Sequence, residues 1–274
     1  MSGHRICAKS RAPADDSFSF KDRILLTVFS QSIKILGRVV RAPLNLIPPR
    51  SVVPILSGRL LGKRWIVGSG IHRCWLGFYE RGKQELIART VKPDSVFYDV
   101  GANVGIYSLL ASMLVDAGKV FAFEPLPRNT EFLSEHIRLN RLSNVELLPV
   151  AISDMVGISH FDVEETGYMG HLASGCRGIS VRTETVDSLV ASEMILPPNY
   201  IKMDVEGAEL LAIRGAAETF KEHRPTLFLA THGHELHTEC LRLLQSWGYE
   251  CRMLGPMING KGEVLALPRG FAIK

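Results

Sequence analysis

The sequence predicts a doubly wound α/β domain with a mostly parallel sheet, preceded by a basic helical and β extension. Three observations lead to this prediction: apolar runs alternate with stretches of helical periodicity, a glycine-rich turn follows one of these runs, and charge is divided unequally along the chain. Residues 1–90 carry a formal charge of +11, whereas residues 91–274 carry −7. We therefore divide the chain into an extension, residues 1–63, and a main domain, residues 64–274.

The extension is predicted to contain one amphipathic helix. Residues 1–20 are polar and irregular, residues 21–41 place apolar residues at helical spacing with basic residues between them, and prolines between residues 43 and 54 mark a linker. Two interpretations remain open: the helix packs on the main domain, or it lies on an anionic membrane surface. Its charges argue against a membrane span, and no signal-peptide pattern is present. We expect a cytoplasmic protein, with peripheral membrane contact through residues 21–41 as the alternative.

In the main domain, strands and helices are expected in alternation. A short β segment within residues 64–80 precedes a helix over 82–91. Apolar runs then predict strands at 95–100, 119–124, 145–152, 199–205 and 225–231, with helices near 105–115, 127–140, 207–221 and 234–246. Two late apolar pieces, 249–254 and 263–268, suit an antiparallel hairpin at a sheet edge. Such a sheet, wound with helices on both faces, binds its ligand beyond the carboxyl ends of the strands.

The glycine-rich turn follows the strand predicted at 95–100, in the stretch YDVGANVGIYSLLAS at residues 98–112. A dinucleotide-binding loop needs glycine where this chain has Asn103 and Ile106, and an ATP loop needs a lysine that is absent. These substitutions argue against an NAD-dependent oxidoreductase. An adenosine ligand without phosphates fits better. S-adenosylmethionine has a carboxylate that suits backbone amides at a helix start and an ammonium that suits Asp99.

Two further acids are candidates for holding this cofactor. Glu124 ends the next predicted strand, 23 positions after Gly101, where an acid can accept both ribose hydroxyls. Asp154 follows the strand after that and is a candidate for the adenine amino group. Each acid also has a structural interpretation: Asp99 as a helix cap, Glu124 as a solvated strand end, and Asp154 as a turn residue.

At these residues the sequence resembles the FkbM-type family of class I S-adenosylmethionine-dependent methyltransferases. The matching stretches are FYDVGANVGIYSLLAS, VFAFEPLPRNTEFLSEHIRLN, NVELLPVAISD and YIKMDVEGAELLAIRGA, in this order. The resemblance implies a Rossmann-like seven-stranded sheet whose last strand is antiparallel. It implies that the methionine part of the cofactor is held by Asp99, Gly101, Asn103 and Gly105, the ribose by Glu124 and the adenine by Asp154. It also implies methyl transfer to a hydroxyl of a sugar, glycan or polyketide-like acceptor.

Removal of the hydroxyl proton is the step for which a base is needed. The candidates for catalysis are His232 and His234, followed by Asp204 and Glu206. The sequence departs from the family here, because Ala230 and Thr231 stand where the family tends to have a Glu before its His.

We expect no metal, because the one set considered, formed by His232, His234, His237 and Cys240, lacks a zinc-type spacing. The five cysteines are scattered and are expected to be reduced.

The favoured function is O-methylation of a small-molecule or glycan hydroxyl. N-methylation and a non-catalytic methyltransferase-like binding module are the alternatives. No nucleic-acid partner is expected, and the sequence leaves the oligomeric state open.

Overall fold

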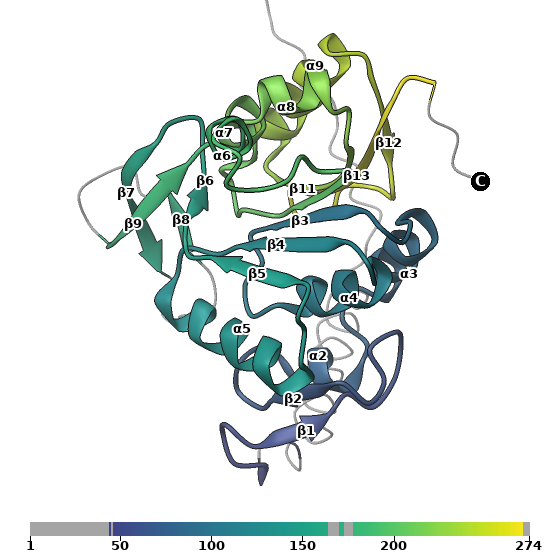
Figure 1. Cartoon of the computed structure of the whole chain (residues 1–274), viewed down its shortest axis with the longest axis vertical. Helices are drawn as coiled ribbons and strands as arrows, with labels where there is room; N and C mark the ends of the chain where they lie inside the picture. Colours follow the sequence, from purple (N-terminus) through teal and green to yellow (C-terminus); the bar gives the residue numbers. More distant parts are fainter. Residues whose placement is uncertain (1–43, 45, 164–169, 173–177, 271–274) are drawn as a thin grey trace, which may run out of the picture. The chain divides into compact units, whose positions relative to one another are not determined.

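The computed structural model describes residue 44 and residues 46–163, 170–172 and 178–270. The chain divides into two compact units, residues 1–48 and 49–274, and the helices and strands labelled in Figure 1 belong to the second unit. The amphipathic helix predicted over residues 21–41 lies outside the described residues. No helix of the described part is long and apolar enough to cross a membrane. The division at residue 63 stays a prediction.

One mixed sheet of seven strands forms the centre of this unit, in the order β5-β4-β3-β10-β11-β13-β12 (Figure 1). In chain order its strands are β3 (Val96–Val100), β4 (Lys119–Phe123), β5 (Val145–Leu148), β10 (Tyr200–Met203), β11 (Thr226–His232), β12 (Tyr249–Met253) and β13 (Lys261–Pro268). Six strands run in the same direction, and β13 is reversed, being antiparallel to both β11 and β12. The predicted fold class and the late hairpin are therefore confirmed.

Helices cover both faces of the sheet. Figure 1 shows α3 (Arg81–Thr90), α4 (Ile106–Leu114) and α5 (Pro127–Asn140) on one side, and α6 (Val186–Ala191) and α9 (His234–Ser246) on the other. All four residues of β10 are buried, as expected of a central parallel strand covered on both faces. The strand order reverses at β3, which has β4 on one side and β10 on the other, so the carboxyl end of β3 is the switch point.

Two predicted elements are divided in the structure. The apolar run 145–152 forms β5 and then β6 (Ala151–Ile152), which belongs to a second sheet of order β6-β9-β7-β8. Its other strands, which were not predicted from the sequence, are β7 (Gly157–Val163), β8 (Gly170–Leu172) and β9 (Ile179–Glu184). The helix predicted over 207–221 is two helices, α7 (Glu209–Arg214) and α8 (Ala217–Glu222). Gly215 lies between them, and a Cβ there would collide with the backbone carbonyl of Ser153.

A small hairpin and a short helix precede α3. Strands β1 (Val52–Pro54) and β2 (Arg64–Ile66) pair in antiparallel fashion, and α2 (His72–Leu76) follows. The buried His136 of α5 joins this segment to the glycine-rich turn: its Nε2 accepts from the amide of Ile66 at 3.0 Å, and its Nδ1 lies 2.7 Å from the carbonyl oxygen of Val104. Because Ile66 must donate, Nδ1 carries the proton and donates to Val104. Trp65 stacks on the same imidazole with a centroid distance of 4.1 Å.

We expect His136 to make the fold sensitive to acid. Burial lowers the pKa of His136 to about 4, from 6.5 in the unfolded chain. The unfolded state therefore binds a proton at a higher pH than the folded state, and the contribution to stability is lost as pH falls from about 6.5 to about 4. Denaturant unfolding should give a loss of about 3 kcal/mol from this group across that window.

The exposed His234 provides the control, since a His234→Ala variant should keep the full pH dependence whereas His136→Ala should lose this part of it. If His136→Ala does not fold, NMR titration of the imidazole in the unaltered chain decides. An imidazole that protonates near its ordinary pKa would contradict the account.

Candidate functional site

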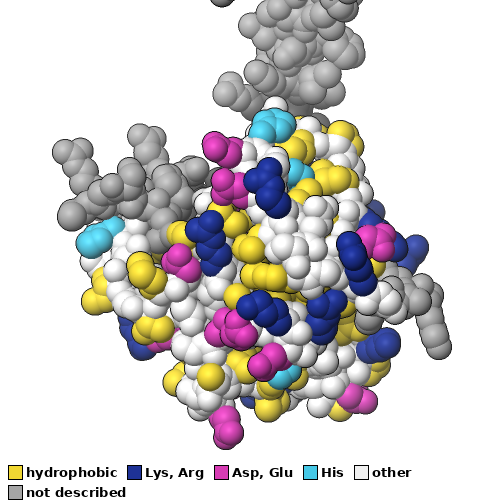
Figure 2. All heavy atoms as spheres, turned by 90° about the horizontal axis from the view of Figure 1, so that it is seen from above, with side chains coloured by type: hydrophobic (Ala, Val, Ile, Leu, Met, Phe, Trp, Pro, Cys, Tyr) yellow, Lys and Arg dark blue, Asp and Glu magenta, His cyan; other side chains and the backbone are white. Residues whose placement is uncertain are grey.

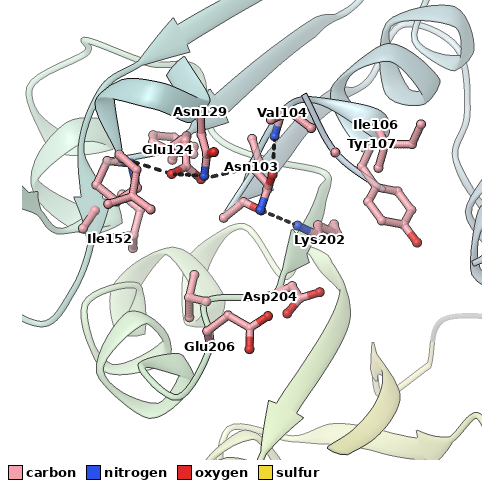
Figure 3. A pocket seen from close by; sticks show the side chains of 18 of the residues that line it. Asn103, Val104, Ile106, Tyr107, Glu124, Asn129, Ile152, Lys202, Asp204 and Glu206 are labelled. Atoms are coloured by element: carbon pink, nitrogen blue, oxygen red, sulfur yellow. Dashed lines mark hydrogen bonds between the residues drawn. The ribbon is translucent and has the colours of Figure 1, made fainter. Parts of the chain in front are cut away.

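A cavity of about 520 Å³ opens at the carboxyl ends of β3, β4 and β10, where the switch point places a ligand. Its volume is in the range of small-molecule sites. Its lining includes Gly101–Val104, Glu124–Leu126, Val150–Ile152 and Phe161, together with Lys202 and Asp204–Glu206. Gly70, Ile71, Cys74 and Tyr79 close it from the segment around α2. Figure 3 shows Glu124 and Asn129 in one part of the cavity, with Asp204 and Glu206 across from them.

The glycine-rich turn adopts a left-handed backbone at three of its five positions. The φ angles are 73° at Gly101, 50° at Asn103 and 92° at Gly105. Asparagine is among the non-glycine residues that tolerate this region, which explains how Asn103 replaces the expected glycine. The amides of Gly101 and Ala102 both donate to the carbonyl oxygen of Phe123 at 3.0 Å, so the turn is fixed to the end of β4.

Gly101 cannot be replaced without moving its neighbour. A Cβ at this position would collide with the carbonyl oxygen of Asp204, because β3 and β10 run side by side and their ends meet here. The positive φ adds a second cost for any other residue. Glycine is therefore required at position 101 for two reasons: the Asp204 carbonyl oxygen lies too close for a side chain, and φ is positive.

A buried ion pair lies directly beneath the turn. Asp99 and Lys202 are register partners on β3 and β10, and their side chains are 0% and 3% exposed. The Lys202 ammonium lies 3.1 Å from Asp99 Oδ1 and donates to the carbonyl oxygen of Gly101 at 2.7 Å. Asp99 Oδ2 accepts from the Ser108 hydroxyl of α4 at 2.7 Å. The Asp99 carboxylate is thus held by contacts within the protein, and Asp99 is not among the residues that line the cavity.

Glu124 lies beside the turn and does line the cavity. It is 5% exposed and accepts three hydrogen bonds, from the amides of Asn103 (2.8 Å) and Leu126 (3.0 Å) and from the Asn129 side chain (3.2 Å). Burial raises its pKa, and these hydrogen bonds only partly oppose the effect. A carboxylate has about four acceptor positions, so one remains for a ligand besides these three hydrogen bonds.

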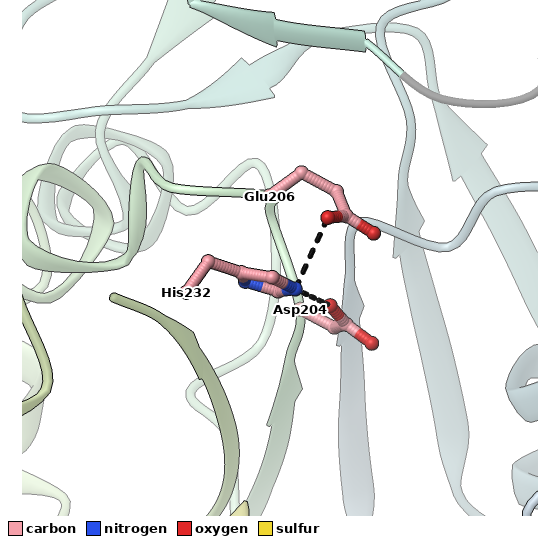
Figure 4. A group of neighbouring side chains, drawn as sticks. All are labelled: Asp204, Glu206 and His232. Atoms are coloured by element: carbon pink, nitrogen blue, oxygen red, sulfur yellow. Dashed lines mark ion pairs between the residues drawn. The ribbon is translucent and has the colours of Figure 1, made fainter. Parts of the chain in front are cut away.

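Three of the four residues predicted for catalysis come together at the ends of β10 and β11. Figure 4 shows Asp204 and Glu206 facing the His232 imidazole, whose Nε2 lies 3.7 Å from Asp204 Oδ1 and 3.0 Å from Glu206 Oε2. The Nδ1 atom lies 2.8 Å from Oε1 of Glu209, which is fully buried. Burial disfavours the charged imidazole, but the hydrogen bond with Glu209 and the nearby carboxylates outweigh it, so the pKa of His232 is raised. We call Asp204, Glu206, His232 and Glu209 the acid–histidine cluster.

The charge state of Asp204 depends on two buried lysines. Burial alone would raise the pKa of Asp204, but Lys202 and Lys83 outweigh it, so the pKa is lowered. Lys83 is itself buried on α3, 2.8 Å from Glu263 of β13. Asp204 is therefore a carboxylate at neutral pH.

The remaining predicted residues lie elsewhere. Asp154 does not line the cavity; its Oδ1 accepts from the Ser153 hydroxyl at 3.3 Å, as expected of a turn residue. His234 is exposed at the first position of α9. The histidines considered above as zinc ligands do not converge on one point. The buried His237 contacts Thr231 Oγ1 at 2.8 Å, whereas His232 faces Asp204 and Glu206. No contact in the described part of the chain therefore supports the roles predicted for Asp154 and His234.

Several residues of the site were not predicted from the sequence. Lys202 is one of them. The sequence signal for it was a lone lysine inside an apolar run, which the sheet places next to the strand of Asp99. Glu209 is another, and it holds His232 through a contact 23 residues along the chain. Cys74 and Tyr79 come from the segment before α3, where no motif points to a site. Burial raises the pKa of the Cys74 thiol to about 12, so Cys74 is a wall of the cavity rather than a nucleophile.

Known proteins similar to this chain are methyltransferases. Hexuronic acid methyltransferase AglP from Haloferax volcanii is 32% identical over 139 residues, which cover 49% of this chain and 56% of that protein. 2-O-methyltransferase NoeI from Sinorhizobium fredii is 28% identical over 160 residues, which cover 52% and 65% respectively. This chain thus spans less than two thirds of either relative. The crystal structure of methyltransferase FkbM from Methylobacillus flagellatus covers 72% of this chain and 55% of its own, with 17% identity and a TM-score of 0.47.

The family model described as the methyltransferase FkbM domain matches residues 99–251, which include the glycine-rich turn, Glu124 and the acid–histidine cluster. This match covers more than half of the chain. The chain therefore belongs to the FkbM methyltransferase domain family.

Proposed function

We propose that this chain is an S-adenosylmethionine-dependent O-methyltransferase acting on a hydroxyl of a sugar-like acceptor. The observation that carries the proposal is that the glycine-rich turn, Glu124 and the carboxylates of Asp204 and Glu206 all open into one cavity. Two relatives, named as a hexuronic acid methyltransferase and a 2-O-methyltransferase, support the acceptor class.

In this proposal the cofactor lies along the ends of β3 and β4. Glu124 accepts a hydrogen bond from a ribose hydroxyl, and the methionine part lies against the turn from Gly101 to Gly105. Leu126, Ile152 and Phe161 form an apolar wall that suits the adenine ring. Asp99 has a positioning role instead of a direct one, because its carboxylate is occupied by Ser108 and Lys202.

The cofactor, when bound, supplies an electrophilic methyl group on a sulfonium. The protein has to align the acceptor oxygen with that methyl group and accept the hydroxyl proton. The acid–histidine cluster is the group we assign to the acceptor side, since Asp204 and Glu206 line the cavity across from Glu124. His234 has no part in this assignment.

The extension belongs to the proposal only in outline. In this proposal, residues 1–63 either contribute to acceptor binding or determine where the protein is located. The formal charge of +11 on residues 1–90 motivates this role. Peripheral contact with an anionic membrane through residues 21–41 and a cytoplasmic location remain part of this proposal.

We expect Gly101→Ala to reduce binding of S-adenosylhomocysteine at least tenfold, because the new methyl group would push the turn away from the Asp204 carbonyl. Gly62→Ala is the matched control: Gly62 also has a positive φ, 82°, but nothing lies within 4 Å of the added Cβ. Both variants should lose about 1–2 kcal/mol of stability from the left-handed backbone. Calorimetry that finds equal affinity in the two variants would show that the turn does not position the cofactor.

We expect affinity for S-adenosylhomocysteine to fall as pH is lowered through the raised pKa of Glu124, because the protonated carboxyl loses its charge and an acceptor. The loss should therefore begin above the ordinary range of a glutamate. Glu124→Ala should weaken binding by roughly 1.5–3 kcal/mol at neutral pH and remove this pH dependence. Glu146→Ala, an exposed acid on β5, is the control and should behave as the unaltered chain. A folded Glu124→Ala variant with unchanged affinity would refute the ribose role.

The reaction itself is tested with methyl-labelled S-adenosylmethionine and a panel of uronic acids, neutral oligosaccharides and amino sugars. We expect label to enter a hydroxylated sugar as a methyl ether, with release of one S-adenosylhomocysteine per methyl transferred. Label found on an amine would change the assignment to N-methylation. Cofactor binding without transfer to any acceptor would favour the non-catalytic binding module.

A further inference from the structure

We propose that the acid–histidine cluster binds one divalent cation, with Asp204, Glu206 and His232 as its protein ligands. One potential ligand atom from each of these residues lies within 4.8 Å of the others. The three come from separate places: Asp204 directly follows β10, Glu206 lies in the next turn, and His232 ends β11. Because the strands are parallel neighbours, the sheet itself brings the ligands together.

The His232 imidazole is already oriented as a metal ligand. Its Nδ1 lies 2.8 Å from Glu209 Oε1, so Nδ1 keeps its proton, and Nε2, which points at Asp204 and Glu206, is the nitrogen that a cation would bind in place of a proton. Glu209 is 0% exposed and is fixed by the Gly207 amide at 3.0 Å. A carboxylate that holds the second nitrogen of a metal-binding histidine is a recurring arrangement, and it selects the tautomer.

One ligand atom is buried without a hydrogen-bond partner among the described residues. Asp204 Oδ1 is inaccessible to solvent, although the side chain as a whole keeps 20% of its surface exposed toward the cavity. An unsatisfied buried oxygen of an ionised carboxylate is costly, and a cation at this point would satisfy it. Glu206 has a left-handed backbone (φ 50°), a conformation that costs energy outside glycine, and its carboxylate lies 3.0 Å from the same imidazole.

The local charge also favours a cation. Asp204, Glu206 and Glu209 bring three carboxylates to one imidazole. The buried lysines nearby are paired with other acids, Lys202 with Asp99 and Lys83 with Glu263. Lys261 lies 3.5 Å from Glu206, but its side chain is 58% exposed. A divalent ion would offset the excess of carboxylates at this point.

The donor set indicates the class of ion. Two carboxylates and one imidazole suit Mn²⁺ and related first-row ions, and Mg²⁺ is the weaker alternative because it prefers oxygen alone. Three protein ligands leave coordination positions open toward the cavity. If the proposed function holds, the acceptor oxygen would occupy one of them. The expectation of no metal followed from ligand spacing along the chain, which does not detect ligands at two separate strand ends.

The test uses the full chain, freed of metal with a chelator, and titration with Mn²⁺ monitored by electron paramagnetic resonance without cofactor or acceptor. We expect one ion per chain, with binding weakened at least tenfold in Glu206→Gln and in His232→Ala. Glu209→Gln should weaken binding roughly 10–100-fold, because it releases the imidazole from its fixed tautomer. Glu235→Gln, an exposed acid at the start of α9, is the control and should bind as the unaltered chain.

Circular dichroism of each variant establishes that it folds. If His232→Ala fails to fold, Glu206→Gln decides. Absence of binding at millimolar Mn²⁺, or binding that survives Glu206→Gln, would overturn the proposal and leave His232 and the nearby lysines as the counter-ions of the cluster. This measurement does not depend on methyl transfer. Failure of the metal proposal and failure of the proposed function can therefore be told apart.

Discussion

The buried pair of Asp99 and Lys202 is the interaction on which the site depends. It joins two central strands at the level where both end, and it extends by hydrogen bonds to the Gly101 carbonyl and to Ser108 of α4. Taking two charges out of water costs several kcal/mol for each ion, and the pair offsets this only while both partners are present. Loss of one partner would leave an uncompensated charge beneath the turn that faces the cavity.

The two sides of the cavity follow from this arrangement. On one side, the turn is attached to β4 through Phe123 and receives the Glu124 carboxylate at the Asn103 amide. On the other side, the end of β10 passes so close to Gly101 that no side chain fits between them, and Asp204 is placed at that point. The turn with Glu124 and the pair Asp204 and Glu206 thus lie on opposite sides of one cavity, and in the proposed function the first side would hold the cofactor and the second would face the acceptor.

Much of the fold and part of the site could be predicted from the sequence, because the signals are local. The alternation of apolar runs with helical periodicity gives the seven strands and the helices over 127–140 and 234–246, and the position of Glu124 after its strand places it at the cavity. The remainder depends on contacts between distant residues. The run 145–152 passes from one sheet to the other between β5 and β6, and Gly215 separates α7 from α8; periodicity alone detects neither division. Asp99 has the right position for a cofactor contact, but the register of β3 and β10 pairs it with Lys202 instead.

The central claim is that this pair, more than the local turn sequence, fixes the geometry of the site. A double-mutant cycle with Asp99→Asn, Lys202→Met and the combined variant tests it most directly, measured as the free energy of unfolding. The account predicts a loss of about 3–5 kcal/mol for Lys202→Met and a substantially smaller loss for the double variant, since removing both charges leaves none uncompensated. Losses that simply add would contradict it, because they would show that the two buried side chains act independently.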